Sequence, residues 1–526
     1  MKRFIFSLVA AAAVLASVLM AGTAPARAAA PLPANGSGAG HAAAPRVVNV
    51  RDLPAAPPAA AQANTALGNP GHLPTAGASL PSKPTTGHRP LAPGAQSANA
   101  SPRLASGTVS GFGGISDNLG GFCGSCGEAN TSAAVSSTQI MQVADLGFRV
   151  LNKPTLTTCS NFRSVASLLN SGSAPIYQPQ VQYDNLQRRF ILTAIEATFN
   201  AGTAPAIWVA ASMGDDACGA WFVYRITFSG PSWPTTSDII GLVPGQDSNA
   251  LLFGVDNFIP SFQSYSVFGI AKSQLYFGSP VSFSTLATAS FAAPATNAGF
   301  PMISTPFSYF VSAIPGTGYQ LYRLTNSGGP GATVTLQATI SSPYSGPKRL
   351  VNQPGTTVGI APASGVILTS PVTDGTRIWF AHDADVSGFP TVQFGAITIA
   401  TNTVATALAY HSGTSDDFNP SIGVGIGSGG AETIFLNWAY TDAPVGVATS
   451  DTVDSYVTTS GQVLTQIGSD VPVVHGDVTT TFGINFSFLS SVGIDPSAVD
   501  GSCAVAAQQF YTSGDWNTEI SRIGNC

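Results

Sequence analysis

The side chains best suited to acid–base chemistry lie close together in the C-terminal half of the chain. Histidine and aspartate are adjacent at His382 and Asp383, and a second set follows about one hairpin later. A carboxylate near a histidine can supply the general acid and base that cleave a glycosidic bond. The pattern predicts His382, Asp383, His411 and Asp417 as catalytic groups, and Arg377, Trp379 and Asp416 as ligand-binding groups.

The same residues also have a structural interpretation, and it is the one we favour. Turns between strands require polar side chains, because their backbone groups need local hydrogen-bond partners. The chain has no Gly-x-Ser-x-Gly nucleophile turn, no His-Glu-x-x-His zinc motif and no phosphate-binding glycine loop. The sequence therefore leaves both a catalytic and a purely structural role open for this cluster.

The segment from Asp383 to Gly388 begins like a calcium-binding loop. Oxygen ligands alternate along such loops, and a glycine permits the sharp turn. The twelfth position holds Phe394 in place of the bidentate glutamate that completes these loops. We expect no cofactor, and the alternative is Ca²⁺ bound by Asp383, Asp385 and Ser387.

A third polar group stands further upstream. Tyr183, Asp184, Arg188, Arg189 and Glu196 could place charges near a central channel. The alternative, which we prefer, is a turn capped by Asp184 with an arginine at a strand edge.

Strands must position these side chains, because β-type segments dominate the chain from about residue 106 onward. The polar corner from Asp416 to Pro420 leads into an apolar strand, a glycine-rich turn and a second strand. A related arrangement follows the segment from Asp247 to Asn249. A recurring strand–corner–strand unit indicates a radially repeated all-β architecture. We predict a β-propeller of about six to eight four-stranded blades, with one short helix at residues 161–169.

The N-terminal region has the composition of targeting and linker segments. Lys2 and Arg3 precede an apolar run, and Ala26-Arg27-Ala28 forms a small-x-small cleavage site. Residues 1–28 are therefore predicted to be a signal peptide, the alternative being an uncleaved membrane anchor. Residues 29–105 are rich in Ala, Pro and Gly and predict a disordered linker, followed by the propeller domain at 106–526.

The charge balance excludes some classes of function. The 526 residues include 20 Lys+Arg and 26 Asp+Glu, and charged residues make up only 9%. A formal net charge of −6 provides no basic surface for nucleic acid. As a partner we expect an extracellular glycan or a surface protein, with no membrane span after signal cleavage and a monomeric state.

An even number of cysteines in an exported chain predicts disulfides. The six cysteines are Cys123, Cys126, Cys159, Cys218, Cys503 and Cys526. We predict a Cys503–Cys526 bond, because it would fasten the last strand pair to the end of the chain. For Cys123 and Cys126 a structural disulfide is favoured over a redox pair, since no thioredoxin-like βαβ pattern surrounds them.

Several segments carry a pattern seen elsewhere: residues 139–153, residues 179–192, the corner from Asn419 to Ile422, and the tail at 493–503 and 515–524. In these segments the chain resembles a family of secreted bacterial proteins with a sialidase-like β-propeller. The resemblance implies the propeller and export, and it implies no reaction. The chain lacks the Ser-x-Asp-x-Gly-x-Thr-Trp box and a triad of arginines for a substrate carboxylate, so sialidase activity is not expected.

The sequence thus predicts a secreted or extracellular β-propeller that acts as a binding or surface-interaction module. The alternative is a secreted hydrolase or lyase that acts on an extracellular polysaccharide. Convergent polar groups at one concave mouth would favour the enzyme, and a flat or threonine-rich face would favour the binding module.

Overall fold

Strands that are neighbours in the sequence pair with one another through short turns. Asn and Gly residues at many of these turns adopt the left-handed conformation that short hairpins need. The computed structural model describes residues 38–54, 110–116, 129–144, 147–153, 155–172, 174, 176–196, 204–235, 238–259, 261–297, 307–329, 331–363, 365–427, 430–458, 464–466, 470–477, 489–512 and 515–526. Among them, no helix has the length and apolarity needed to cross a membrane.

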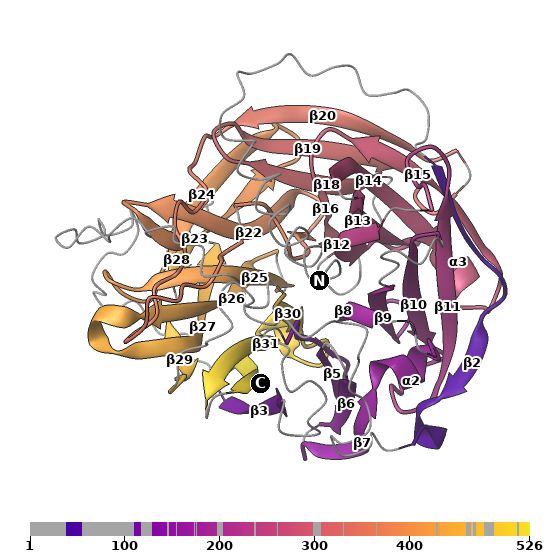
Figure 1. Cartoon of the computed structure of the whole chain (residues 1–526), viewed down its shortest axis with the longest axis horizontal. Coiled ribbons are helices and arrows are strands. Elements are labelled where there is room, and N and C mark those ends of the chain that lie inside the picture. The colour runs from indigo at the N-terminus through magenta and orange to yellow at the C-terminus, as the bar shows by residue number, and fades with distance from the viewer. Residues whose placement is uncertain are drawn as a thin grey trace, which may run out of the picture.

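The described strands form six hydrogen-bonded sheets, and the largest sheet contains two blades, so the ring has seven blades (Figure 1). The first four blades are β4 (Ser132–Val135), β5 (Gln139–Ala144), β6 (Gly147–Asn152) and β7 (Thr157–Ser164); β8 (Ile176–Asp184), β9 (Arg189–Glu196), β10 (Ala206–Ser212) and β11 (Ala220–Ser229); β12 (Asp238–Gln246), β13 (Ala250–Ile259), β14 (Ser261–Ala271) and β15 (Val281–Thr288); and β16 (Ala293–Pro294), β18 (Phe307–Ile314), β19 (Gly318–Thr325) and β20 (Thr333–Ser341). The last three are β21 (Val372–Thr373), β22 (Arg377–Val386), β23 (Phe389–Thr398) and β24 (Thr403–Ala409), with β17 (Thr296–Asn297) beside β21; β25 (Asp416–Ile426), β26 (Glu432–Asp442) and β27 (Val447–Thr458), with β28 (Leu464–Gln466) and β29 (Val471–Val474) on β27; and β30 (Ser491–Ile494), β31 (Cys503–Thr512), β32 (Asp515–Gly524) and β3 (Ser110–Ser116). The predicted all-β propeller and its range of blade numbers are confirmed.

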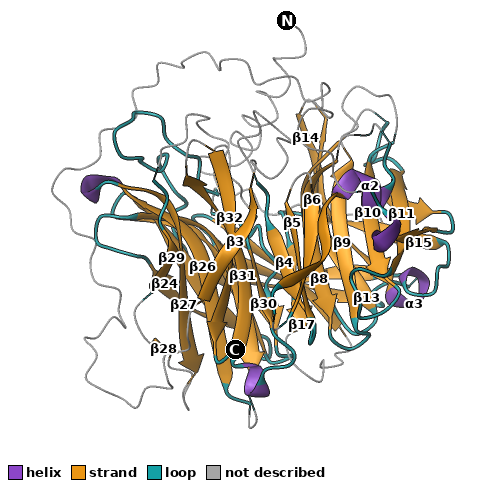
Figure 2. Ribbon diagram, turned by 90° about the horizontal axis from the view of Figure 1, so that it is seen from below, coloured by secondary structure: helices purple, strands orange, loops and turns teal. Residues whose placement is uncertain are grey.

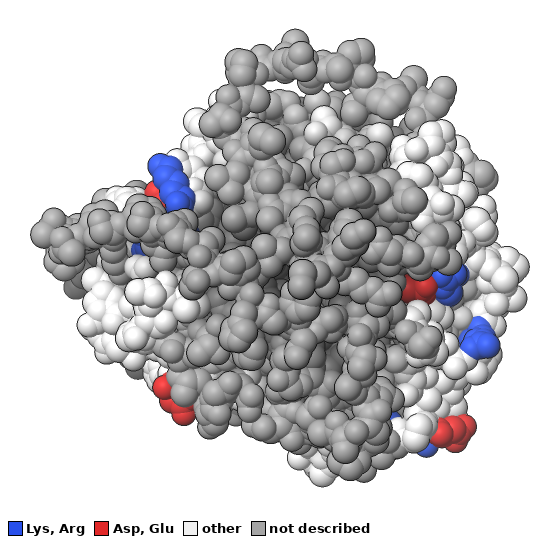
Figure 3. Space-filling model, viewed as in Figure 1, with Lys and Arg blue, Asp and Glu red and all other residues white. Residues whose placement is uncertain are grey.

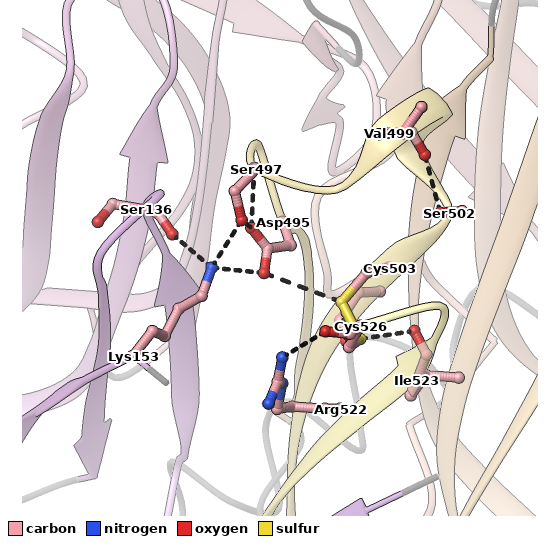
Figure 4. Close-up of a disulfide and its surroundings, with 11 residues drawn as sticks. Ser136, Lys153, Asp495, Ser497, Val499, Ser502, Cys503, Arg522, Ile523 and Cys526 are labelled. Carbon is pink, nitrogen blue, oxygen red and sulfur yellow. Dashed lines mark hydrogen bonds and ion pairs between the residues drawn. A yellow bond between two sulfur atoms is a disulfide. The ribbon is translucent and has the colours of Figure 1, made fainter. Parts of the chain in front are cut away.

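Blade 7 closes the ring because its strands come from opposite parts of the chain. β3 pairs with β32 in antiparallel register, so residues near position 110 hydrogen-bond to residues near position 520. The predicted Cys503–Cys526 disulfide is confirmed and fastens the end of this blade (Figure 4). A second disulfide joins Cys159 to Cys218. Cys123 and Cys126 lie outside the described residues.

The strand β1 (Gly38–Ala42) inserts between the outer strands of blades 2 and 3. It pairs with β11 on one side and with β15 on the other, and β2 (Arg46–Asn49) continues along β11 before the turn η1 (Val50–Asp52). A Cβ atom on Gly40 would lie 2.1 Å from the ring of Phe283, so only glycine fits there.

The linker prediction for residues 29–105 is therefore wrong at 38–54. Small residues that resemble a flexible linker in composition are needed here for close packing of a strand against an aromatic ring. The rest of the predicted linker, and the signal peptide at 1–28, lie outside the described residues.

The helical turns are short and lie at the periphery of the molecule (Figure 2). The helix predicted at 161–169 is confined to α2 (Val165–Leu169), because the preceding residues belong to β7 and Ser164 caps the helix. The remaining turns are α3 (Lys272–Leu275), η4 (Ala443–Val445) and η5 (Val499–Gly501).

Adjacent blades pack through their faces, which bury large side chains. Between blades 2 and 3 the rings of Phe228 and Trp233 stack with centroids 4.4 Å apart, and those of Phe268 and Phe283 stack at 4.6 Å. Such stacked pairs add to the stabilisation that comes from burying their apolar area. Among the described residues visible in Figure 3, charged side chains are few and scattered.

Candidate functional site

The hairpins give the ring two faces, which we name by the direction of the innermost strands. The entry face is where the innermost strand of each blade begins, as at Asp416 of β25. The exit face is where that strand ends, as at Asp184 of β8. The two faces divide the sequence-predicted site residues into separate groups.

A central cavity of about 150 Å³ lies between the innermost strands. It is lined by β4, β8, β25 and β30 together with residues of β12, β17 and β21. None of the described lining residues carries a charge. The polar ones offer only amides and hydroxyls: Ser132, Gln180, Gln182, Tyr183, Asn185, Gln246, Thr296, Asn297, Thr369, Ser370, Ser421, Ser490 and Ser491.

Three polar atoms of this lining are buried without a hydrogen-bond partner among the described residues. They are Oε1 of Gln182 in β8, Oδ1 of Asn185 just after β8, and the hydroxyl oxygen of Ser421 in β25. The amide nitrogen of Gln182 donates to the carbonyl of Pro244 at 2.8 Å, which fixes the orientation of the side chain. Because buried polar atoms are nearly always paired, these three atoms mark where a ligand hydroxyl or a water can bind.

His382 lies in the core, outside the cavity lining. Its Nδ1 is 2.8 Å from the carbonyl oxygen of Asp383, so Nδ1 must be the donor. Its Nε2 lies 2.9 Å from the Tyr319 hydroxyl, which is in turn the acceptor for the Gln393 amide. Burial lowers the pKa of His382 to about 4. Both ring nitrogens are thus used in structural hydrogen bonds, and the ring is neutral.

Asp383 is also fully buried, and its Oδ1 accepts the backbone N–H of Asn419 at 2.8 Å. Burial raises the pKa of Asp383 well above its usual range. The carboxyl group therefore joins β22 to β25 and is not exposed to a substrate in this structure.

Asp416 and Asp417 likewise hold the start of β25. Asp416 pairs in a bidentate manner with Arg349, at 2.7 and 2.5 Å, and both side chains are buried. Asp417 accepts hydrogen bonds from the indole of Trp438 at 2.9 Å and from Ser415 at 2.7 Å. Asp417 is adjacent to His411 as predicted, but the contact runs from the backbone N–H of His411, at 2.8 Å.

His411 has the geometry of a general base. Its Nδ1 lies 2.6 Å from Oδ2 of Asp470, and its ring packs against that of Tyr440 in a tilted arrangement with centroids 4.2 Å apart. Its side chain is 24% exposed. Burial alone would lower the pKa of His411, but the hydrogen bond to Asp470 and the nearby carboxylates raise it. The carboxylate fixes the proton on Nδ1, which makes Nε2 the acceptor when the ring is neutral.

Arg377 and Trp379 lie towards the exit-face end of β22, whereas Asp385 lies at its entry-face end. Arg377 pairs with Glu432 at 2.5 Å, and the Trp379 indole donates to the same carboxylate at 2.8 Å. Burial raises the pKa of Glu432 to about 7. About six residues of extended strand separate Trp379 from Asp385, which corresponds to roughly 20 Å. The structure therefore does not bring the predicted ligand-binding trio of Arg377, Trp379 and Asp416 together.

The predicted calcium loop is a tight β-hairpin turn. Ser387 and Gly388 both have positive φ, and Asp385 accepts the Gly388 N–H at 3.2 Å. Among the described His, Cys, Asp and Glu side chains, only Cys159, Asp216 and Cys218 converge closely enough to hold a metal, and the two cysteines form a disulfide. Calcium binding by Asp383, Asp385 and Ser387 remains a prediction.

The structure also separates the upstream polar residues, Tyr183, Asp184, Arg188, Arg189 and Glu196, into different local contacts. Asp184 caps a turn through its Oδ1, which accepts the backbone N–H groups of Leu186 and Gln187 at 3.0 Å each. Tyr183 lines the cavity, and its hydroxyl donates to Asp215, which also pairs with Arg188. Glu196 lies at the end of β9 and pairs with Arg225 of β11.

Sequence reasoning missed Asp470, Gln182 and Ser421. Asp470 lies 59 residues from His411 in the chain, and Gln182 and Ser421 lie in different blades. No local motif could identify them, because none of them is close in sequence to the group it acts with.

No protein-family model and no curated protein matches the chain. Among solved structures, a Trypanosoma rangeli sialidase in complex with sialic acid has a TM-score of 0.35 at 11% identity over 70% of this chain and 56% of that one. The phage phi92 endosialidase has a TM-score of 0.38 at 6% identity over 76% and 67%. The Phanerochaete chrysosporium exo-beta-1,3-galactanase has a TM-score of 0.28 at 10% identity over 76% and 95%.

This chain spans just over half the length of the trypanosomal sialidase. These neighbours agree with the predicted resemblance to sialidase-like propellers. At such identities and TM-scores they carry no argument about activity, and the fold is established by the strand order itself.

Proposed function

We propose that the protein is a secreted binding module whose central cavity takes an uncharged, hydroxyl-rich ligand, such as the end of a glycan. The observation that carries this proposal is the presence of buried, unpartnered polar atoms, among them Gln182 Oε1 and Ser421 Oγ, in a wall without charged side chains. A sugar hydroxyl can donate to the first and exchange a hydrogen bond with the second. The two disulfides fit an oxidising, extracellular compartment.

The test measures binding and product release together, on a panel of neutral and acidic oligosaccharides. We expect neutral oligosaccharides to bind without turnover, and Ser421→Ala to weaken binding by about tenfold, the equivalent of one lost hydrogen bond. Ser312→Ala is the matched control, since Ser312 is a buried, unpartnered hydroxyl outside the cavity lining. Equal binding by the Ser421→Ala variant, or no binding of any neutral sugar, would contradict the proposal.

Repeating the binding measurements with and without a calcium chelator tests the predicted calcium site at Asp383, Asp385 and Ser387. Binding that disappears with the chelator and returns on adding Ca²⁺ would support calcium binding there. Unchanged binding would contradict it.

A second candidate function is cleavage of an extracellular polysaccharide by a hydrolase or lyase reaction, with His411 as the general base. The hydrogen bond from Nδ1 to Asp470 supports it, because this bond orients Nε2 as a proton acceptor. We expect His411→Ala to lower product release by at least about 100-fold, and His41→Ala, at an exposed position of β1, to leave it unchanged. Release that persists in the His411→Ala variant would exclude this site.

A further inference from the structure

A buried lysine and a buried aspartate meet between blades 2 and 3. Nζ of Lys272, at the start of α3, lies 2.7 Å from Oδ2 of Asp184, at the end of β8. The Lys272 side chain is 4% exposed and that of Asp184 is fully buried. Two carbonyl oxygens also face Nζ, those of the Gln246 side chain at 2.9 Å and the Asp247 backbone at 2.6 Å.

This arrangement suits a neutral amine as well as an ammonium ion. A neutral amine has two N–H groups, which the carbonyls of Gln246 and Asp247 accept, and one lone pair, which then faces the Asp184 carboxyl. Transfer of one proton from Lys272 to Asp184 inside the pair produces that amine and a carboxylic acid. Burial lowers the pKa of the Lys272 ammonium, which favours the neutral amine that the reaction needs.

The other side of the carboxyl group carries the donors that acyl transfer requires. Oδ1 accepts two backbone N–H groups, from Leu186 and Gln187, each at 3.0 Å. Two such donors stabilise the oxyanion of a tetrahedral intermediate. Oδ2 accepts the Tyr276 hydroxyl at 2.7 Å, so a proton donor stands at the oxygen that would leave.

We propose that Lys272 and Asp184 form an intramolecular isopeptide bond. Nζ attacks Cγ of the protonated Asp184, the C–Oδ2 bond breaks, and Oδ2 leaves as water with a proton supplied through Tyr276, which recovers one from the attacking nitrogen. The products are one amide and one water, and no oxidant, reductant or cofactor takes part. Gln246, which contacts Nζ of Lys272, also lines the central cavity.

A second lysine–aspartate pair lies at the equivalent place between blades 7 and 1. Lys153 follows the third strand of blade 1 and lies 2.5 Å from Asp495, which follows the first strand of blade 7 (Figure 4). Here Oδ1 accepts the backbone N–H and the hydroxyl of Ser497, at 2.9 and 2.7 Å, and the Nζ atom also contacts that hydroxyl at 3.1 Å. No tyrosine hydroxyl among the described residues contacts Oδ2 of Asp495. This pair therefore has donors at Oδ1 but no phenol at the oxygen that would leave, and we expect no isopeptide bond between Lys153 and Asp495.

The test is the mass of the purified full chain under denaturing conditions. We expect a mass lower than the disulfide-bonded sequence by one water, about 18 Da, and a branched peptide containing Lys272 and Asp184 after proteolysis. Lys272→Arg abolishes the mass loss, and the matched Lys153→Arg variant leaves it unchanged. Tyr276→Phe keeps both reacting groups and slows bond formation at least about tenfold, which covers the case in which Lys272→Arg does not fold.

Two results would overturn the proposal. One is a full mass with separate Lys272 and Asp184 peptides. The other is a loss of water without the branched peptide, since a cyclic imide at Asp184 has the same mass.

Discussion

Two histidines of the predicted catalytic cluster lie in opposite environments. His382 is buried between aromatic rings, with Tyr344 at a centroid distance of 4.4 Å, and its hydrogen-bond partners are a carbonyl and a phenol. His411 is partly exposed and pairs with a carboxylate. The pKa of His382 falls to about 4, whereas that of His411 rises.

The difference shows that the neighbours of a histidine, and not its type or spacing in the sequence, decide whether it can transfer protons. A ring with both nitrogens committed to neutral partners stabilises the fold. A ring held by one carboxylate keeps its second nitrogen available. The four predictions below examine this contrast, from the largest expected effect to the smallest.

Removing the buried ring should have the largest effect. We expect His382→Ala to lower the free energy of unfolding by about 3 kcal/mol, because it leaves a void and removes the acceptor of the Tyr319 hydroxyl proton. Urea unfolding followed by tryptophan fluorescence measures the change. His411→Ala is the control, and we expect it to lower the free energy of unfolding by about 1 kcal/mol or less. Equal losses of stability in the two variants would show that the two histidines do not differ in their structural role.

Acid should destabilise the protein through protonation of His382. The folded pKa of His382, about 4, lies below the value of about 6.5 for an unfolded histidine, so the unfolded chain takes up the proton first. The contribution of the neutral ring to the free energy of unfolding is fully present above pH 6.5 and falls by about 3 kcal/mol as the pH drops towards 4. The measurement is the free energy of unfolding of the wild type and of His382→Gln across this pH range. The same dependence on pH in both proteins would contradict the prediction.

The pH dependence of His411 should have the opposite sign. Its folded pKa is raised, so its stabilising effect is present below the unfolded value and is lost as the pH rises through the folded value. The expected size is about 1 kcal/mol, since the pair with Asp470 is partly exposed. NMR titration of the ring should show a lower midpoint in Asp470→Asn than in the wild type, and an unchanged midpoint would show that Asp470 does not set it.

An exposed ion pair should have the smallest effect and extends the comparison to the surface. Arg51 and Asp216 lie 2.5 Å apart, with side chains 57% and 45% exposed. We expect Arg51→Ala to lower stability by less than about 1 kcal/mol, and this loss to vanish at high salt. Urea unfolding at low and high salt measures it, and a loss as large as that of His382→Ala would be unexpected.

Local sequence patterns account for much of the fold. Strands such as β11 and β23 are contiguous β-rich runs with turn residues at each end, so their existence follows from neighbours in the chain. The hairpin of β25 and β26 was predictable for the same reason. The two polar corners that the sequence pattern presents as repeats, at Asp416 and at Asp247, are not equivalent, however. Asp416 begins an innermost strand on the entry face, whereas Asp247 follows an innermost strand on the exit face.

The sequence by itself determined the all-β propeller class, the Cys503–Cys526 bond and the short helix near residue 165, since each depends on residues that are close together in the chain. Only the tertiary structure decided that β1 fills the gap between two blades, that Asp470 reaches His411, and that Lys272 meets Asp184. The physical reason is that blades form from local hairpins, but their packing around one axis sets which distant side chains meet. Burial and hydrogen-bond partners, which fix the chemistry of those side chains, arise only at that step.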